Sequence, residues 1–192
     1  MERVIGWIGW MRLRERRMLI WANRRPSGNR LFIALDRWLS TVTHMGGATF
    51  TLATALLCAL LAPAPWSTAG WQSLAAVVIS HIPVAIVKRK LKRLRPYQAL
   101  PDVNTCPKPL SDSSFPSGHT TAIFAWIVPL LLIGGLWTIA IAPVAALVAL
   151  SVAWSRMYLG LHYPSDVAAG AMIGIGTALA VNALWLEQSP FL

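Results

Sequence analysis

The stretch 113-SSFPSGHTTAIFAWIVPLLLIGGLWTIAIAPVAALVALSVAWS-155 contains no Asp, Glu, Lys or Arg over its whole length. A helix needs about 20 mainly apolar residues to cross the hydrocarbon core of a bilayer, so this stretch is long enough for two crossings. Gly134-Gly135 lies near its middle and is typical of a turn between two helices. The stretch therefore predicts a pair of membrane spans.

Two more uncharged stretches extend the pattern, one between Arg37 and Lys88, broken at Pro63-Ala64-Pro65, and one between Asp166 and Glu187. Only 12% of all residues are charged and the mean hydropathy is +0.55, whereas a soluble domain carries about 25% charge. Because a spanning segment must satisfy its own backbone hydrogen bonds, the expected fold class is all-α, a polytopic bundle of about five transmembrane helices. The expected spans are 44–62, 70–90, 117–133, 137–155 and 165–186.

The chain begins with a strongly basic segment. Arginines at residues 1–30 are interleaved with Trp and aliphatic side chains, a pattern typical of an amphipathic helix in the membrane interface. No clean apolar run with a small-residue cleavage site follows, so the segment is not interpreted as a signal peptide. The expected organisation is a basic interfacial arm at 1–43 and a membrane-embedded domain at 44–192. The alternative is a basic tail that only helps to set the topology.

The formal net charge of +10 raises the question of nucleic acid as a partner. The basic residues flank apolar spans, however, where the positive-inside rule expects them and where they attract anionic lipid headgroups. We therefore expect the bilayer and its lipids as partners, and no nucleic acid. Cys58 is expected within a span and Cys106 in a loop, so no disulfide is predicted between them. The oligomeric state stays open.

The expected topology places all of the Lys and Arg residues on one side of the membrane, together with the motifs described below. Arg3 to Arg37 contribute basic residues to that side, and Glu187 is the one charged residue expected on the other. By the positive-inside rule the motif side faces the cytoplasm. The expected location is a bacterial inner (plasma) membrane.

Lys88 and Arg95 lie where the second expected span ends. They are separated by two helical turns, so they share a face if the helix continues, and His81 lies two turns further back on the same stripe. A basic cluster at a span end is also common without any function, because long cationic side chains reach for the headgroups. His81 is a secondary site candidate, since an ionisable group within a span is often functional. A neutral histidine hydrogen-bonded between helices is the alternative.

Ser117, Gly118 and His119 follow Pro116 at the start of the third expected span. Free backbone N–H groups and the positive end of the helix dipole favour phosphate there, and Gly118 would let an anion approach the backbone. An ordinary helix cap with a solvated histidine is the alternative.

Arg156 ends the fourth expected span, and His162 precedes the fifth. Asp166 follows four residues after His162, in the first turn of the fifth span. A carboxylate there can accept from one imidazole nitrogen, which fixes the tautomer and leaves the other nitrogen free to attack. The alternative is an interfacial histidine beside a helix-capping aspartate.

Taken together, the three segments resemble the type 2 phosphatidic acid phosphatase family, the kin of the vanadium haloperoxidases. The resemblance rests on K-x6-R-P at Lys88–Pro96, P-S-G-H at Pro116–His119 and S-R-x5-H-x3-D at Ser155–Asp166, and it covers about residues 44–186. Many membrane members have six spans, whereas this chain is expected to have five.

The resemblance implies a catalytic site in which His162 attacks phosphorus and becomes a phosphohistidine. Asp166 would orient His162, and His119 would protonate the leaving group and then activate water. The implied phosphate-binding residues are Lys88, Arg95, Arg156, Ser117 and Gly118. Dense positive charge also suits the phosphoryl transition state by general chemistry. No cofactor or metal is expected, because the motif side carries no carboxylate cluster suited to magnesium.

The expected function is therefore an integral membrane lipid phosphatase. A cytoplasmic site favours phosphatidylglycerophosphate or phosphatidic acid, and an outward-facing site would favour undecaprenyl diphosphate. A haloperoxidase shares the motifs, but the members of that family are soluble. A non-catalytic lipid or ion transporter remains a further alternative, which would not need both His119 and His162.

Overall fold

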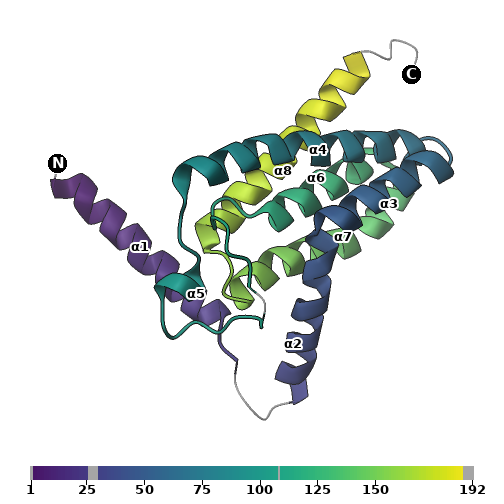
Figure 1. Cartoon of the computed structure of the whole chain (residues 1–192). Helices are drawn as coiled ribbons and strands as arrows, with labels where there is room; N and C mark the ends of the chain where they lie inside the picture. The colour runs from purple at the N-terminus through teal and green to yellow at the C-terminus, as the bar shows by residue number, and fades with distance from the viewer. Residues whose placement is uncertain (1, 26–29, 108, 188–192) are drawn as a thin grey trace.

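The computed structural model describes residues 2–25, 30–107 and 109–187. These residues are mainly helical and contain no strand, so the expected all-α fold is confirmed (Figure 1). The elements in chain order are α1 (Glu2–Ala22), α2 (Arg30–Val42), the 3-10 turn η1 (Thr43–Gly46), α3 (Ala48–Leu61), α4 (Trp66–Leu91), α5 (Pro96–Ala99), α6 (Gly118–Leu132), α7 (Gly135–Tyr158) and α8 (Pro164–Glu187).

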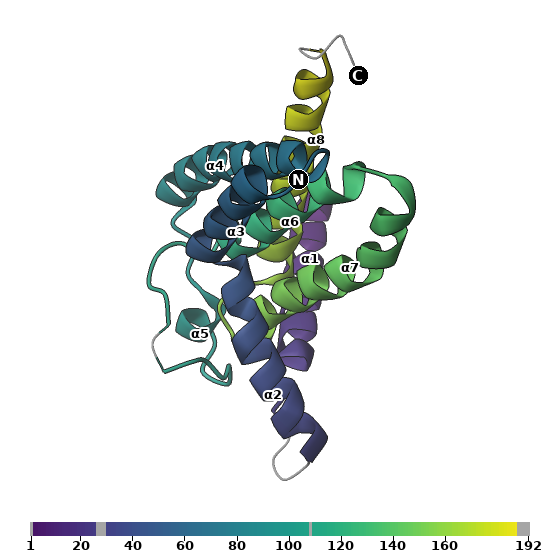
Figure 2. The ribbon, with the colours of Figure 1, turned by 90° about the vertical axis from the view of Figure 1, so that its right-hand side faces the viewer.

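Helix α6 lies at the centre of the bundle and packs against α4, α7 and α8, while α3 covers α4 (Figures 1 and 2). Two glycines let α8 approach α6 closely. A Cβ atom at Gly170 would lie 2.6 Å from the Ser117 carbonyl oxygen, and one at Gly174 would lie 2.4 Å from that of Thr121. This small-residue spacing is typical of close helix packing in membranes, and it joins the two helix starts that carry His119 and Asp166.

Three helices are long and apolar enough to cross a membrane, namely the one that starts at Trp66, α7 and α8. Helices α2 and α3 together provide a fourth candidate span, bent by 62° at η1. Helix α6 is apolar but has 15 residues, about 22 Å at 1.5 Å per residue, which is short for a hydrocarbon core of about 30 Å. The described residues therefore support three or four spans, and the count of five stays a prediction.

The break between α2 and α3 differs from the continuous span expected at 44–62. The reason is a close approach of the chain at Gly46, where a Cβ atom would lie 2.6 Å from Val152 Cγ1 and 2.8 Å from the His119 carbonyl oxygen. Only a residue without a side chain fits there. The turn brings Thr43 against the ends of α6 and α7 instead of continuing the helix.

The N-terminal segment forms two helices. Helix α1 packs against α7 and α8, and it ends at the buried Asn23, whose Nδ2 donates to the carbonyl oxygens of Asn104 (2.9 Å) and Tyr158 (2.7 Å). Helix α2 projects from the bundle (Figure 1) and exposes apolar side chains such as Trp38. The interfacial position and the boundary at residue 43 stay predictions.

Candidate active site

Four helix ends bring the three motifs together at one end of the bundle. Arg95, after α4, contacts His162, before α8, with 3.1 Å between Nη1 and Nε2. The Ser117 N–H, at the start of α6, donates to the Asp166 carbonyl oxygen in the first turn of α8 (3.0 Å). Arg156 ends α7 beside them. The segments that the sequence places at span ends are thus neighbours in space.

His162 is buried, with 1% of its surface exposed, and both of its ring nitrogens have partners. Nδ1 lies 2.7 Å from the Ser114 carbonyl oxygen. A carbonyl can only accept, so we assign the proton to Nδ1. Nε2 then carries the lone pair and accepts from Arg95. Burial, followed by the charges of Arg156, Arg95 and Lys88, lowers the pKa of His162 well below its usual range, so the imidazole is neutral near pH 7.

Asp166 stands beside His162 but is held by other donors. Its Oδ2 lies 3.6 Å from His162 Nδ1, which is longer than a hydrogen bond. Oδ2 accepts from the Tyr163 N–H at 2.7 Å, and Oδ1 accepts from Arg93 Nη1 at 2.7 Å. In this structure the Ser114 carbonyl, rather than the carboxylate, accepts the imidazole proton.

Arg156 is the most incompletely bonded cation of the site. Only 2% of its surface is exposed, and Nη1 donates to Thr43 Oγ1 at 2.7 Å. Its Nε and Nη2 are buried and have no hydrogen-bond partner among the described residues. A buried donor without an acceptor is costly, so these two donor nitrogens beside the histidines indicate a place for an anion.

Lys88 and Arg95 share a carboxylate that the sequence reasoning did not single out. Lys88 Nζ lies 2.6 Å from Asp112 Oδ2, and Arg95 Nη2 lies 2.6 Å from Asp112 Oδ1. Burial alone would raise the pKa of Asp112, but its bonds to Lys88 and Arg95 and their charges lower it to about 2. The carboxylate is therefore charged and competes with any phosphate oxygen for both cations.

Ser117 and Gly118 begin α6. The Ser117 hydroxyl caps the helix, since its Oγ accepts from Thr120 Oγ1 at 2.9 Å and weakly from the Thr120 N–H. A Cβ atom at Gly118 would meet only Val84 Cγ1 at 4.0 Å, so the space in front of it is open to an anion. His119 follows, half-buried, and interacts electrostatically with neighbours that include Arg156, His162 and Lys88.

His81 makes a different contact from the other candidates. Its Nδ1 lies 2.8 Å from the carbonyl oxygen of Val77, one turn back on α4. This contact lies within its own helix and does not connect His81 to the motif residues. Its secondary role stays a prediction.

Several residues of this site were missed by the sequence reasoning. Ser114 acts through its backbone carbonyl, which leaves no trace in a side-chain pattern. Thr43 reaches Arg156 across 113 positions, and Arg93 reaches Asp166 across 73. The signal that was available was weak: Arg93 is one of several cations between positions 88 and 95, and nothing in that run singles it out.

No group of three or more His, Cys, Asp or Glu side chains within the described ranges is placed to hold a metal ion. Metal independence is not tested by that finding and stays a prediction.

The sequence-family model of the PAP2 superfamily matches residues 69–189 of this chain, a range that includes both motif histidines, His119 and His162. The putative undecaprenyl-diphosphatase YbjG of Escherichia coli is 39% identical over 75 residues, which is 39% of this chain and 36% of that protein. The decaprenylphosphoryl-5-phosphoribose phosphatase of Mycobacterium tuberculosis is 33% identical over 119 residues, which is 62% of this chain and 60% of that protein. The matches thus span about one third to three fifths of these relatives.

The fold of this chain is also similar to that of a solved structure. The crystal structure of a transmembrane PAP2-type phosphatidylglycerolphosphate phosphatase from Bacillus subtilis has a TM-score of 0.73. The likeness covers 95% of this chain and 89% of that one at 21% identity, and it therefore concerns the fold. With helices apolar enough to span a bilayer and a family model that covers more than half of its length, this integral membrane protein belongs to the PAP2 superfamily.

Proposed function

We propose that the protein hydrolyses a phosphomonoester or diphosphate on a membrane lipid through a phosphohistidine formed on His162. The family acts on lipid phosphates. The observation that carries the proposal is the surrounding of His162 Nε2. This unprotonated nitrogen lies beside Arg95, in a site where Arg156 has two buried donors without partners among the described residues.

In the first step Arg95 moves its hydrogen bond from Nε2 to a phosphoryl oxygen, the freed Nε2 lone pair attacks phosphorus, the N–P bond forms and the bond to the leaving oxygen breaks. His119 acts in its protonated form, which a bound phosphate dianion favours, and it gives its proton to that oxygen. The Nδ1–H bond to the Ser114 carbonyl supports the positive charge that the ring acquires. In the second step His119 takes a proton from water, water attacks phosphorus and the N–P bond breaks, so inorganic phosphate leaves and His162 is neutral again.

The phosphoryl oxygens would be held by the same groups that the sequence singled out. Arg156 offers Nε and Nη2, and the start of α6 at Gly118 offers open space at a helix N-terminus. Lys88 and Arg95 join when the phosphate displaces Asp112. Electrostatic stabilisation of the charge that develops in the transition state usually contributes more to such catalysis than any other single effect.

For the substrate we propose phosphatidylglycerophosphate or phosphatidic acid first, because the charge distribution favours a cytoplasmic site. Undecaprenyl diphosphate is the second candidate, and the observation that favours it is the 39% identity with YbjG over 75 residues. The two candidates differ in the membrane face to which the site would open.

Phosphate release by the purified protein from a lipid panel tests the proposal. The panel contains phosphatidylglycerophosphate, phosphatidic acid, undecaprenyl diphosphate and undecaprenyl monophosphate in mixed micelles. We expect turnover of at least one of them, with the largest kcat/KM for a phospholipid. A largest value for undecaprenyl diphosphate would reverse the order of the candidates, and no release from any member would contradict the proposed activity.

We expect the activity to survive EDTA and to be inhibited by vanadate. The proposed site holds the phosphoryl group with Arg156, Arg95 and Lys88 and needs no metal, and this set of donors also suits a trigonal-bipyramidal oxyanion. The measurement is phosphate release before and after dialysis against EDTA, and then against a vanadate series. Activity that disappears in EDTA and returns with magnesium would contradict the proposed chemistry.

We expect the site to face the cytoplasm. Ser67 and Ser111 lie towards opposite ends of α4, Ser67 in its first turn and Ser111 in the loop after Arg95. Each is changed to cysteine in a Cys58→Ala/Cys106→Ala background and labelled in intact cells with an impermeant thiol reagent. Labelling of Ser67→Cys but not of Ser111→Cys is the expected result. The reverse pattern would place the site outside and favour undecaprenyl diphosphate.

A further inference from the structure

Arg93 occupies one of the unspecified positions between Lys88 and Arg95 of the first motif, yet it contacts the acid of the third one. Its Nη1 donates to Asp166 Oδ1 at 2.7 Å and to Ser165 Oγ at 2.8 Å. Its Nη2 donates to Glu15 Oε2 at 2.8 Å, and its guanidinium carbon lies 4.0 Å from the centre of the Tyr163 ring. One side chain thus connects helix α1 with the segment that carries His162 and Asp166.

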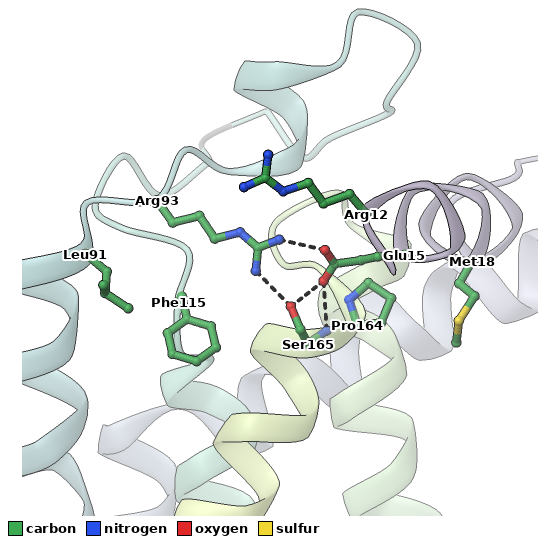
Figure 3. A pocket seen from close by; sticks show the side chains of 8 residues that line it. All are labelled: Arg12, Glu15, Met18, Leu91, Arg93, Phe115, Pro164 and Ser165. Atoms are coloured by element: carbon green, nitrogen blue, oxygen red, sulfur yellow. Dashed lines mark hydrogen bonds and ion pairs between the residues drawn. The ribbon is translucent and has the colours of Figure 1, made fainter. Parts of the chain in front are cut away.

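Glu15 is the acidic residue within the basic run from Arg12 to Arg17. The arginines of that run are exposed, whereas the Glu15 side chain is only 17% exposed and faces the start of α8 (Figure 3). Its Oε1 accepts from the Ser165 N–H at 3.1 Å and from the Ser165 hydroxyl. The first N–H groups of a helix need outside acceptors, and a carboxylate is favoured there. Helix α1 therefore supplies a cap for α8.

We propose that Arg93 is a positioning residue for Asp166, and that Glu15 of α1 holds Arg93 in place. The inference rests on the proposed phosphohistidine chemistry. The Asp166 carboxylate is fully buried, and the Tyr163 N–H and Arg93 bind one oxygen each. Without Arg93 the carboxylate loses the charged partner of Oδ1 and keeps the Tyr163 N–H and the Ser114 side chain as hydrogen-bond partners. Its distance to His162 Nδ1, now 3.6 Å, is then held less firmly.

The hydrogen bonds of Arg93, rather than its position, distinguish this role from phosphate binding, because Arg93 also lines a cavity with Lys88 and Asp112. Both of its terminal nitrogens donate to protein groups, Nη1 to Ser165 and Asp166 and Nη2 to Glu15, and it lines a cavity of about 590 Å³ between α1 and the start of α8 (Figure 3). Arg93 and Glu15 lie at this partly open surface, but removing Arg93 takes a cation from the buried Asp166 carboxylate, so the folding of each variant has to be measured. The N-terminal arm becomes a structural part of the active site.

The test compares Arg93→Gln, Arg93→Lys and Glu15→Gln with Arg89→Gln, a matched control from the same basic segment that is exposed. We expect Arg93→Gln to lower kcat about 10- to 100-fold with KM nearly unchanged, because the charge of Asp166 beside His162 is then misplaced, and a misplacement of about 1 Å caused away from the chemistry can cost 100-fold. Arg93→Lys should restore part of kcat, because an ammonium can still reach Asp166. Glu15→Gln should have a smaller effect in the same direction, and Arg89→Gln should behave as the wild type.

The double variant Arg93→Gln/Glu15→Gln distinguishes a relay from two separate effects. If Glu15 acts through Arg93, the kcat of the double variant should be close to that of Arg93→Gln alone. If the fold-losses in kcat of the two single variants multiply in the double variant, Glu15 and Arg93 act separately, and the proposal that Glu15 acts through Arg93 is wrong. A raised KM at constant kcat would make Arg93 a substrate-binding cation, and a kcat of Arg93→Gln within twofold of wild type would also overturn the inference.

Two controls keep the result unambiguous. Elution as a single species and the melting temperature in detergent show whether each variant is folded. If Arg93→Gln does not fold, the kcat of Glu15→Gln tests the inference in its place. A wild type that releases phosphate from no lipid would contradict the proposed function and this inference with it. An active wild type with an unaffected Arg93→Gln would contradict this inference alone.

Discussion

Replacing His162 with alanine should abolish turnover while the protein still folds. Nε2 is the proposed nucleophile, and removing a nucleophile that acts together with an acid and a set of cations costs at least about 1,000-fold in kcat. Folding should survive because Arg95 keeps its bonds to the Leu161 carbonyl and to Asp112. Leaving the Ser114 carbonyl without its partner costs about 1–3 kcal/mol of stability.

The measurement combines steady-state phosphate release with a rapid-quench search for the intermediate. With a lipid that carries a radioactive phosphate, the wild type should show acid-labile, alkali-stable label on the protein, and His162→Ala should show none. His44→Ala is the comparison variant: His44 is exposed and takes part in no proposed step, and although it interacts electrostatically with His119, its loss should lower turnover far less than that of His162. Turnover within tenfold of wild type from folded His162→Ala protein would contradict the mechanism.

Replacing His119 with glutamine should also lower turnover, by about 100- to 10,000-fold, which is the range of general acid–base catalysis. His119 lies in the first turn of α6 and interacts electrostatically with Arg156, His162 and Lys88. A lipid alcohol leaves poorly unless its oxygen is protonated, so the first step becomes slower. The second step also becomes slower, because water loses its base.

These two losses can be separated with a leaving group that needs no proton. With p-nitrophenyl phosphate the first step of His119→Gln should be largely rescued, while hydrolysis of the phosphohistidine should stay slow. The expected trace is a burst of nitrophenol stoichiometric with the enzyme, followed by slow turnover. An equal loss with both leaving groups and no burst would contradict the assignment of His119. Burst formation would also exclude the transporter interpretation.

Much of the fold follows from local properties of the chain. Hydrophobic length and the absence of charge predict helices α4, α7 and α8, and the all-α class is confirmed. The break between α2 and α3 was not predicted, because it depends on the close approach of Gly46 to Val152 and His119. Such an approach becomes visible only when helices distant in the sequence are packed together.

The active site, like the fold, has features that the sequence predicts and features that depend on how the helices pack. The sequence by itself determined which cations and which of the motif histidines lie at span ends, because a charged side chain is costly in the apolar interior of a span; His81, inside α4, is an exception. The family match covers residues 69–189, the range that contains these residues. The roles assigned to individual residues stay predictions for the experiments above.

The partners of those residues were decided by the tertiary structure alone. The Ser114 carbonyl sets the tautomer of His162 across 48 positions, Thr43 holds Arg156 across 113, and Glu15 holds Arg93 across 78. The physical reason is that a hydrogen bond depends on distances of about 3 Å and on direction. No periodicity or spacing along the chain specifies those quantities, so they exist only once the helix ends have met.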